Sequence, residues 1–474
     1  MAALIFTKRF RSAAATTALL LVSAVFAWGQ QGASLPRAFE ELFLERTRSV
    51  VAVEFVVELE IERAPITRVG LVLDEAGHII LQDEAIPDWL PVENVREIRV
   101  HALGTDTDGL EAEFLGPHPV SGWNYLKLTN GLPEFFTPIL SYPTARPYLG
   151  EQLWGVGIRP KEFRFRPYLL TGLFSEWQKL PWEVGLTASN IAIPGAAVFN
   201  LRGEFIGWAG DPPSMPFRIE FNGQEQKVSL KSTLEGFTFL SAEEFHQYAP
   251  IEDPAELQKD RPYTGIVGTQ PLSREVAKFL GLEEQGALVM SDVFENGPAD
   301  KAGLKGRDII VGLDGERLPK FSPDNVNVRD LTIRIAQRDV GETVNLTIRR
   351  GEAEMDVPLV LEPTPLQRRD AQRQYYEEAG FTIREFTAED AVNLREYSLD
   401  FRGVIVRFVR PNSPAANVGL RPGDWIQRID DQEVEDFAHA VKRFERALAR
   451  SAKDEVVLLV KRQSETKVIS VKMK

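Results

Sequence analysis

Short β-rich runs dominate the first half of the chain. The runs Ser49 to Glu58, Thr67 to Leu73 and Glu97 to Leu103 are rich in β-branched and apolar residues, and glycine, aspartate and proline turns separate them. This spacing is typical of an all-β sandwich or barrel. A helix is predicted at its entry, near Phe39 to Thr47, and the polar segment from Asp211 to Gly236 is expected to be a long loop.

The second half of the chain contains a repeat. The segment from Asn296 to Leu304 recurs as the segment from Asn412 to Leu420, and an Asp-x-Ile sequence follows each copy. Self-similarity of this kind indicates two copies of one module. Each copy continues with one helix and then strands, which we expect at Asp330 to Gln337, Val344 to Arg350, Phe437 to Ala449 and Glu455 to Lys461.

Two stretches that mix prolines and charges with few aliphatic residues are interpreted as linkers. They cover residues 249–261 and 364–377. The sequence therefore predicts a β-rich domain over residues 38–248, followed by two α+β modules over residues 262–363 and 378–474.

The N-terminal segment has the pattern of a secretory signal peptide. Lys8, Arg9 and Arg11 precede an apolar run from Ala13 to Trp28. This run is shorter than the roughly 20 residues that span a bilayer, so cleavage is favoured over an uncleaved anchor. We expect residues 1–29 to be removed, leaving a periplasmic or secreted protein without a membrane span.

Composition narrows the chemistry. The chain has 474 residues, a formal net charge of −14, five histidines and no cysteine. The acidic balance disfavours nucleic-acid binding, which needs clustered lysine and arginine. Without cysteine there are no disulfides, thiolate metal sites or cysteine nucleophiles. No histidine or carboxylate pair shows ligand spacing, so neither a metal nor a cofactor is expected.

The repeat resembles the PDZ domains of the HtrA (Deg) family of secreted serine proteases. The pattern N-G-P-A-D-K-A-G-L, or N-S-P-A-A-N-V-G-L, followed by D-x-I carries this resemblance. In the family, a loop before each copy binds a peptide carboxylate with backbone N–H groups, and the adjoining strand edge pairs with the peptide. The residues that match this loop are Tyr263, Thr264, Gly265 and Ile266 in the first copy, and Gly380, Phe381, Thr382 and Ile383 in the second.

The resemblance extends upstream into the β-rich domain. Val156 to Pro160, Leu170 to Ser175, Gly203 to Gly207 and Gly236 to Phe239 are similar to family segments. They imply a mostly β fold, in which a chymotrypsin-like double β-barrel precedes two α+β PDZ domains. Packing and turn segments indicate a fold and leave the chemistry to be read from the site.

The same alignment implies that the catalytic triad is lost. Glu84 stands where the family has its histidine, Gly122 where it has its aspartate, and Pro194 where it has its serine; Ala192 replaces an oxyanion-hole glycine. Proline has neither a hydroxyl nor a backbone N–H, so both the nucleophile and one oxyanion donor disappear. The sequence therefore predicts a pseudoprotease.

Other chemistry-bearing side chains offer no replacement. Asp83 and Glu84, as neighbours on a strand, would point to opposite faces. Ser175 and Ser189 lie near the expected cleft, but no base can be assigned to either one. The histidines are all interpreted as structural: His78, His101, His118, His246 and His439.

The prediction is an exported HtrA-like pseudoprotease that binds protein segments or C-termini through its PDZ domains, as an adaptor, scaffold or chaperone-like factor. One alternative is an active serine endopeptidase with a relocated or misaligned triad. Another is a structural envelope protein with blocked PDZ grooves. The resemblance also implies a homotrimer formed through Phe39 to Thr47, or a hetero-assembly with an active relative.

Overall fold

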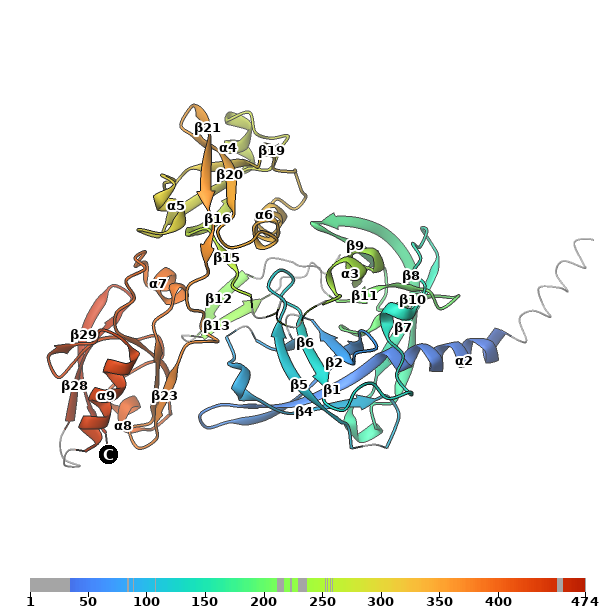
Figure 1. The fold of residues 1–474 in the computed structure, drawn as a ribbon, viewed down its shortest axis with the longest axis horizontal. Coiled ribbons are helices and arrows are strands. Elements are labelled where there is room, and N and C mark those ends of the chain that lie inside the picture. Colours follow the sequence, from blue (N-terminus) through green and yellow to red (C-terminus); the bar gives the residue numbers. More distant parts are fainter. Residues whose placement is uncertain are drawn as a thin grey trace, which may run out of the picture.

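The computed structural model of the chain describes residues 35–82, 85–87, 89–106, 108–210, 217–221, 224–228, 237–251, 253, 255, 257, 259–449 and 455–473. The expected signal peptide, residues 1–29, lies outside them. Two neighbouring barrels are followed by two smaller α+β modules (Figure 1). Within the described residues, no helix combines the length and apolarity needed to cross a bilayer.

The first barrel is a closed six-stranded sheet in the order β1-β2-β3-β6-β5-β4. Alternate residues of β1, among them Val51, Val53 and Phe55, point into its core, as the period-2 pattern predicts. Its elements, with the helices that flank them, are α2 (Leu35–Arg46), η1 (Thr47–Ser49), β1 (Val50–Glu58), β2 (Arg63–Val72), β3 (His78–Leu81), η3 (Val92–Asn94), β4 (Val95–Ala102), β5 (Leu110–Pro117) and β6 (Asn124–Leu128).

The second barrel closes in the order β10-β11-β14-β9-β8-β7. A short helix caps it, and Ser241 begins this helix by accepting the N–H of Glu244 at 3.2 Å. The elements are η4 (Ile139–Ser141), β7 (Gln152–Ile158), η5 (Lys161–Phe163), β8 (Pro167–Leu180), β9 (Trp182–Thr187), β10 (Ala197–Asn200), β11 (Phe205–Ala209), β14 (Phe237–Ser241) and α3 (Ala242–Tyr248).

The expected loop from Asp211 to Gly236 contains a hairpin. Strands β12 (Phe217–Phe221) and β13 (Gln224–Val228) pair antiparallel as a separate two-stranded sheet. The long-loop interpretation is corrected to this extent: the weak periodicity hid two short strands, although the segment adds no strand to either barrel.

The two C-terminal modules share one architecture. In the first, the strands are ordered β16-β17-β18-β20-β21, and in the second β23-β24-β25-β26-β28-β29. The first contains β15 (Pro262–Tyr263), β16 (Ile266–Pro271), α4 (Arg274–Phe279), β17 (Leu288–Val293), α5 (Pro298–Lys301), β18 (Ile309–Leu313), β19 (Glu316–Arg317), α6 (Val326–Ala336), β20 (Thr343–Arg350), β21 (Ala353–Val360) and β22 (Glu362–Pro363). The second contains β23 (Arg373–Tyr376), β24 (Phe381–Glu385), α7 (Ala388–Leu394), β25 (Val404–Val409), α8 (Pro414–Asn417), β26 (Trp425–Ile429), β27 (Gln432–Glu433), α9 (Phe437–Leu448), β28 (Glu455–Arg462) and β29 (Glu465–Lys472).

The aspartate of each Asp-x-Ile sequence is a buried ion-pair partner. Asp308 accepts Nε and Nη2 of Arg350 at 2.7 and 2.6 Å, and Asp424 accepts the same two atoms of Arg462 at 2.6 and 2.7 Å. Both carboxylates are almost fully buried. A buried carboxylate needs such a two-pronged partner, which explains why both modules have an aspartate at this position of the motif and an arginine at the end of the facing strand.

Two elements differ from the sequence-based expectation. Helix α6 begins at Val326, earlier than the expected Asp330, because burial of Val326 and Asn327 outweighs their weak helix propensity. Strand β23 lies inside the stretch interpreted as the linker 364–377. That stretch is poor in aliphatic residues, but Tyr376 supplies a buried aromatic side chain.

Candidate functional site

The position expected for the nucleophile lies in a turn between the two barrels. Pro194 is exposed, and Gly195 follows it with a φ of +89°. A Cβ atom on Gly195 would lie 2.5 Å from the carbonyl oxygen of Val69 in the first barrel. Glycine is therefore required here both by the backbone conformation and by the close approach of the barrels.

The backbone donors around Pro194 are used within the protein. The N–H of Ala192 donates to Oδ1 of Asn190 at 3.3 Å, and the N–H of Ile193 donates to the carbonyl of Val156 at 3.2 Å. The N–H of Gly195 donates to the carbonyl of Ala209 at 2.8 Å. An oxyanion hole needs free donors aimed at the reacting atom, and these three point to acceptors of the protein itself.

The position expected for the orienting aspartate leads into an aromatic cluster. Gly122 has a φ of +77°, and the residue after it, Trp123, is buried. The Trp123 ring lies 5.5 Å from Trp182, 5.2 Å from Trp208 and 6.2 Å from Phe245, measured between ring centroids. We call these four residues the tryptophan cluster.

The tryptophan cluster joins the two substituted positions. Nε1 of Trp208 donates to the carbonyl of Gly195 at 2.8 Å, so the turn that carries Pro194 is fastened to the ring that packs against Trp123. Gly122 and Pro194 are thus connected through the apolar contact of their neighbours, Trp123 and Gly195, with Trp208. Glu84 and Asp83 lie outside the described residues.

Gln82 is a residue between the two barrels that the sequence reasoning missed. Its Nε2 donates to the carbonyl of Ala209 at 2.8 Å, and its own carbonyl accepts Nδ2 of Asn124 at 3.0 Å. The amide thus links the end of β3 to the second barrel. Its position directly after a predicted strand and two residues before Glu84 is the signal that could have identified it.

Two histidines of the first barrel contact carboxylates. Nδ1 of His78 lies 2.7 Å from Asp74, and Nε2 of His101 lies 2.8 Å from Glu54. Burial acts to raise the pKa of Asp74, but the hydrogen bonds and charge of His78 outweigh it and leave this pKa below its usual value.

Ser189 is exposed, and its hydroxyl donates to the carbonyl of Thr171 at 3.4 Å.

His118 closes the turn that leads to Gly122. Its Nδ1 accepts the N–H groups of Val120 and Ser121, each at 3.3 Å, so this nitrogen must be unprotonated. Burial, together with the charge of Arg261, lowers the pKa of His118 to about 4. His118 is therefore a neutral turn residue at physiological pH.

This shift predicts acid sensitivity. The unfolded chain takes up the proton near pH 6.5 and the folded chain near pH 4, so the stabilisation is present above pH 6.5 and is lost as the pH falls towards 4. Between pH 7.5 and pH 5 we expect the free energy of unfolding to fall by on the order of 2 kcal/mol. Urea unfolding of the full chain at pH 7.5 and pH 5 measures it. His118→Asn should flatten the dependence and His439→Asn should not; equal slopes for all three proteins would contradict the assignment.

The first predicted carboxylate-binding loop has backbone donors that no described residue uses, although Gly265 itself is buried. Gly265 has a φ of +74°, and no hydrogen bond of the described residues uses the N–H groups of Thr264 or Gly265. The N–H of Ile266 meets only the hydroxyl of its neighbour Thr264, at 3.3 Å. Strand β16, which follows, pairs with β17 on one side, and its other edge carries no partner strand among those described.

The second loop is arranged differently. Gly380 has a φ of +77°, and its N–H donates to the carbonyl of Tyr376 at 2.7 Å. Phe381, Thr382 and Ile383 are buried in β24, which has β23 on one side and β25 on the other. Of the two sets of predicted loop residues, one thus presents free donors and the other contacts a segment of the same chain.

The domains also touch one another. Arg329 of α6 lies over the ring of Trp182 at 5.7 Å, so the first module contacts the tryptophan cluster. The N–H of Glu295 donates to the carbonyl of Tyr397 at 2.8 Å, which joins the first module to the second. Within the described residues, no group of histidines and carboxylates could hold a metal ion.

Comparison with known proteins agrees with this architecture. The PDZ domain family matches residues 267–361 and 380–473. The chain is 24% identical over 389 residues to a probable periplasmic serine endoprotease DegP-like of Ectopseudomonas mendocina, covering 79% of this chain and 73% of that protein. It is 30% identical over 210 residues to the protein of the same description from Bartonella henselae, covering 43% and 39%.

Solved structures include similar chains. The HtrA-type protease AlgW with decapeptide matches with a TM-score of 0.48 and 14% identity, over 69% of this chain and 99% of that one. The serine endoprotease from Yersinia pestis matches with a TM-score of 0.44 and 17% identity, over 69% of this chain and 97% of that one.

Proposed function

We propose that this chain, a member of the HtrA/DegP family with two PDZ domains, is an exported pseudoprotease that binds peptide segments or C-termini and acts as an adaptor, scaffold or chaperone-like factor. One observation carries the proposal. The turn at the nucleophile position contains Pro194, which lacks a hydroxyl and an N–H, and the N–H groups of Ala192, Ile193 and Gly195 are bonded within the protein. Acyl transfer has neither an attacking group nor an oxyanion site here.

Peptide binding is assigned to the first PDZ domain. The N–H groups of Thr264 and Gly265 have no hydrogen-bond partner among the described residues, and β16 has no partner strand there on its outer edge, which supports binding of a carboxylate and a peptide backbone at this place. Main-chain pairing of this kind supplies affinity with little dependence on sequence. The ligand class we propose is therefore a protein C-terminus or an exposed extended segment of a periplasmic protein.

Selection from a library of C-terminal peptides tests this assignment. We expect binders whose affinity falls at least about tenfold when the terminal carboxylate is amidated, because the charge-assisted bonds to the loop are lost. Gly265→Val should abolish binding, since its Cβ would lie 2.9 Å from Cδ of Pro298. Gly281→Val is the matched control: Gly281 has a φ of +68° in the same domain and open space around it.

The outcome of this selection also separates the candidate functions. No enrichment would favour a structural envelope protein with blocked grooves. Binders that amidation leaves unaffected would contradict the role of the loop at Gly265. Cleavage of the bound peptides would favour the remaining alternative, an active endopeptidase.

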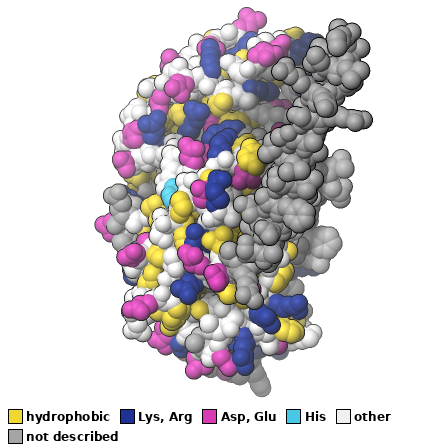
Figure 2. Space-filling model, turned by 90° about the vertical axis from the view of Figure 1, so that its right-hand side faces the viewer, with side chains coloured by type: hydrophobic (Ala, Val, Ile, Leu, Met, Phe, Trp, Pro, Cys, Tyr) yellow, Lys and Arg dark blue, Asp and Glu magenta, His cyan; other side chains and the backbone are white. Residues whose placement is uncertain are grey.

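Trimer formation is a further part of the proposal. Hydrophobic side chains gather between acidic and basic ones on one face of the molecule (Figure 2). Five large apolar residues of the second barrel are more than half exposed, namely Tyr148, Leu149, Phe163, Leu173 and Leu201. Self-association or assembly with an active relative would cover such residues, and light scattering across micromolar concentrations distinguishes a trimer from a monomer.

A further inference from the structure

The second PDZ domain has a strand where the first has an open edge. In the first domain β16 is the edge strand of its sheet, whereas in the second β24 pairs with both β25 and β23. In this extra pairing Tyr376 lies opposite Phe381, Tyr375 opposite Thr382, and Gln374 opposite Ile383. Strand β23 thus takes the edge that an incoming peptide would use.

Strand β23 also runs in the direction that a bound peptide ligand would have. It runs antiparallel to β24, and its last residue, Tyr376, lies at the start of β24, beside the loop that carries Gly380. The carbonyl of Tyr376 accepts the N–H of Gly380 at 2.7 Å. This acceptor stands where a terminal carboxylate would be bound, and the corresponding N–H of Gly265 in the first domain has no such partner.

The side chain of Tyr376 packs between β24 and α9. Its ring lies 5.3 Å from Phe381 on β24 and 4.9 Å from Phe444 on α9, and it is 4% exposed. Tyr375, the neighbouring residue, packs on the opposite face at 6.3 Å from Phe408. One strand therefore supplies both a backbone edge and one buried aromatic anchor, which is what a PDZ ligand supplies.

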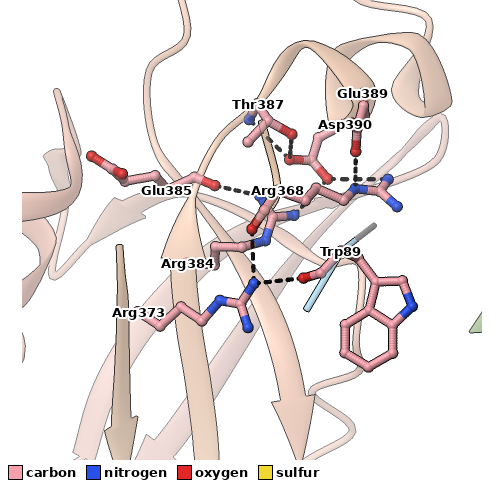
Figure 3. Close-up of polar contacts among 8 residues, drawn as sticks. All are labelled: Trp89, Arg368, Arg373, Arg384, Glu385, Thr387, Glu389 and Asp390. Atoms are coloured by element: carbon pink, nitrogen blue, oxygen red, sulfur yellow. Dashed lines mark hydrogen bonds and ion pairs between the residues drawn. The ribbon is translucent and has the colours of Figure 1, made fainter. Parts of the chain in front are cut away.

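The outer face of β23 contacts the first barrel. Nη2 of Arg373 donates to the carbonyl of Trp89 at 3.0 Å (Figure 3). Arg407 of β25 lies over the Trp89 ring at 4.8 Å. Trp89 follows the predicted catalytic-base position, Glu84, by only a few residues. The strand in the second groove thus contacts the chain segment that follows Glu84 in the sequence.

Repulsion between like charges weakens the pairing of β23 with β24, so that another strand can displace it. Arg373 lies directly opposite Arg384 in the register, and like charges opposite each other destabilise a strand pair. Asp390 accepts Nη2 of Arg384 at 2.7 Å and relieves part of this repulsion (Figure 3). A ligand without an arginine at this register would avoid the clash and could compete with the chain's own strand.

We infer that Arg373–Tyr376 is a built-in ligand of the second PDZ groove, and that this groove accepts an external peptide with an aromatic C-terminal residue only when the strand is displaced. The inference rests on the proposal that the PDZ grooves of this chain bind peptides. It adds that the first groove is open and the second is closed by its own linker, so that one chain carries a constitutive and a gated peptide site.

The test uses the full chain with the first groove disabled by Gly265→Val. The probe is a fluorescent peptide with the sequence of residues 367–376 and a free C-terminal carboxylate. We expect weak binding in this background and binding at least about tenfold tighter after Tyr376→Ala. The matched control is Tyr375→Ala, which removes a ring of the same strand from the opposite face and should cause no gain.

Two outcomes would overturn the inference. Equal binding with and without Tyr376→Ala would show that the groove is not gated, and no gain despite faster hydrogen exchange of residues 373–376 would show that the freed groove takes no peptide. Binding by the first domain is measured separately, in a chain with an intact Gly265, so failure of the proposed function gives a different result: neither domain binds.

A disulfide keeps the inference testable even if Tyr376→Ala fails to fold. The chain has no cysteine, so Tyr375→Cys with Thr382→Cys introduces one cross-strand pair. Directly opposite residues are close enough for a disulfide. Oxidation should form this bond readily and should reduce probe binding in the Gly265→Val background to the detection limit, and reduction should reverse the loss. Failure to form the bond, or binding that ignores the redox state, would contradict the position of β23.

Discussion

Purified protein is expected to leave casein intact and to form no adduct with a fluorophosphonate, and the reversion Pro194→Ser is expected to change neither result. A serine hydroxyl is inert at neutral pH without a base, and the base and orienting positions hold Glu84 and Gly122. Loss of the triad costs on the order of 10⁶-fold in rate. Restoring one member therefore recovers nothing measurable.

The remaining serines provide the internal controls for this assay. Ser175→Ala and Ser189→Ala should behave like the unmodified chain, because Ser189 already donates to the carbonyl of Thr171. If the unmodified protein is labelled and one of these variants is not, the triad has been misassigned and the protein is an enzyme. Adduct formation after the triple change Glu84→His, Gly122→Asp and Pro194→Ser would leave the proposal intact, provided that each of the three changes is required.

The fold could be predicted where the sequence repeats itself or alternates regularly. The helix expected over Phe437 to Ala449 is α9, Phe437–Leu448, and the strand expected over Val344 to Arg350 is β20, Thr343–Arg350. The buried Asp308 and Asp424 explain why the repeat was recognisable, since their ion pairs constrain the spacing. A repeated motif and a regular alternation can both be read from the sequence without knowing which residues they contact.

The environment of the site could not be predicted in the same way. The positions of Gly122 and Pro194 followed from alignment, but the packing of Trp123 against Trp208 depends on closure of both barrels. Gln82 was missed because its partner, the carbonyl of Ala209, is far away in the sequence. Long-range contacts between backbone and side chain leave no periodic pattern.

Strand β23 illustrates the same limit for the PDZ domains. Residues 364–377 look like a linker, because charged residues and prolines dominate and aliphatic residues are few. The strand forms because β24 offers a free edge and the pocket beside Phe444 accepts the ring of Tyr376. Tertiary context decides whether a short polar segment becomes a strand. The adjacent tyrosines at 375 and 376 were the available signal.

The tryptophan cluster gives a physical reason why an acidic side chain would not be accommodated easily at Gly122. A carboxylate introduced at Gly122 would adjoin the buried Trp123, where ionised groups are costly. The carbonyl of Gly195 is already bonded to Nε1 of Trp208, which holds the Pro194 turn in place. The packing of Trp123 against Trp182, Trp208 and Phe245 fastens the first barrel to the second here.

Trp123→Ala is accordingly expected to destabilise the barrel domain by about 3–5 kcal/mol, the usual cost of removing a large buried aromatic side chain. The cavity would open among Trp182, Trp208 and Phe245, all of which pack against this ring. Urea unfolding followed by tryptophan fluorescence measures the change, and Phe279→Ala, at an 88% exposed site in the first PDZ domain, should stay within about 0.5 kcal/mol of the unmodified chain. If the two substitutions lower the free energy of unfolding equally, Trp123 does not hold the barrels together.

Because Arg329 of the first PDZ domain lies over Trp182, Trp123→Ala should also weaken the contact between that domain and the barrels. Faster hydrogen exchange in α6 would reveal this weakening.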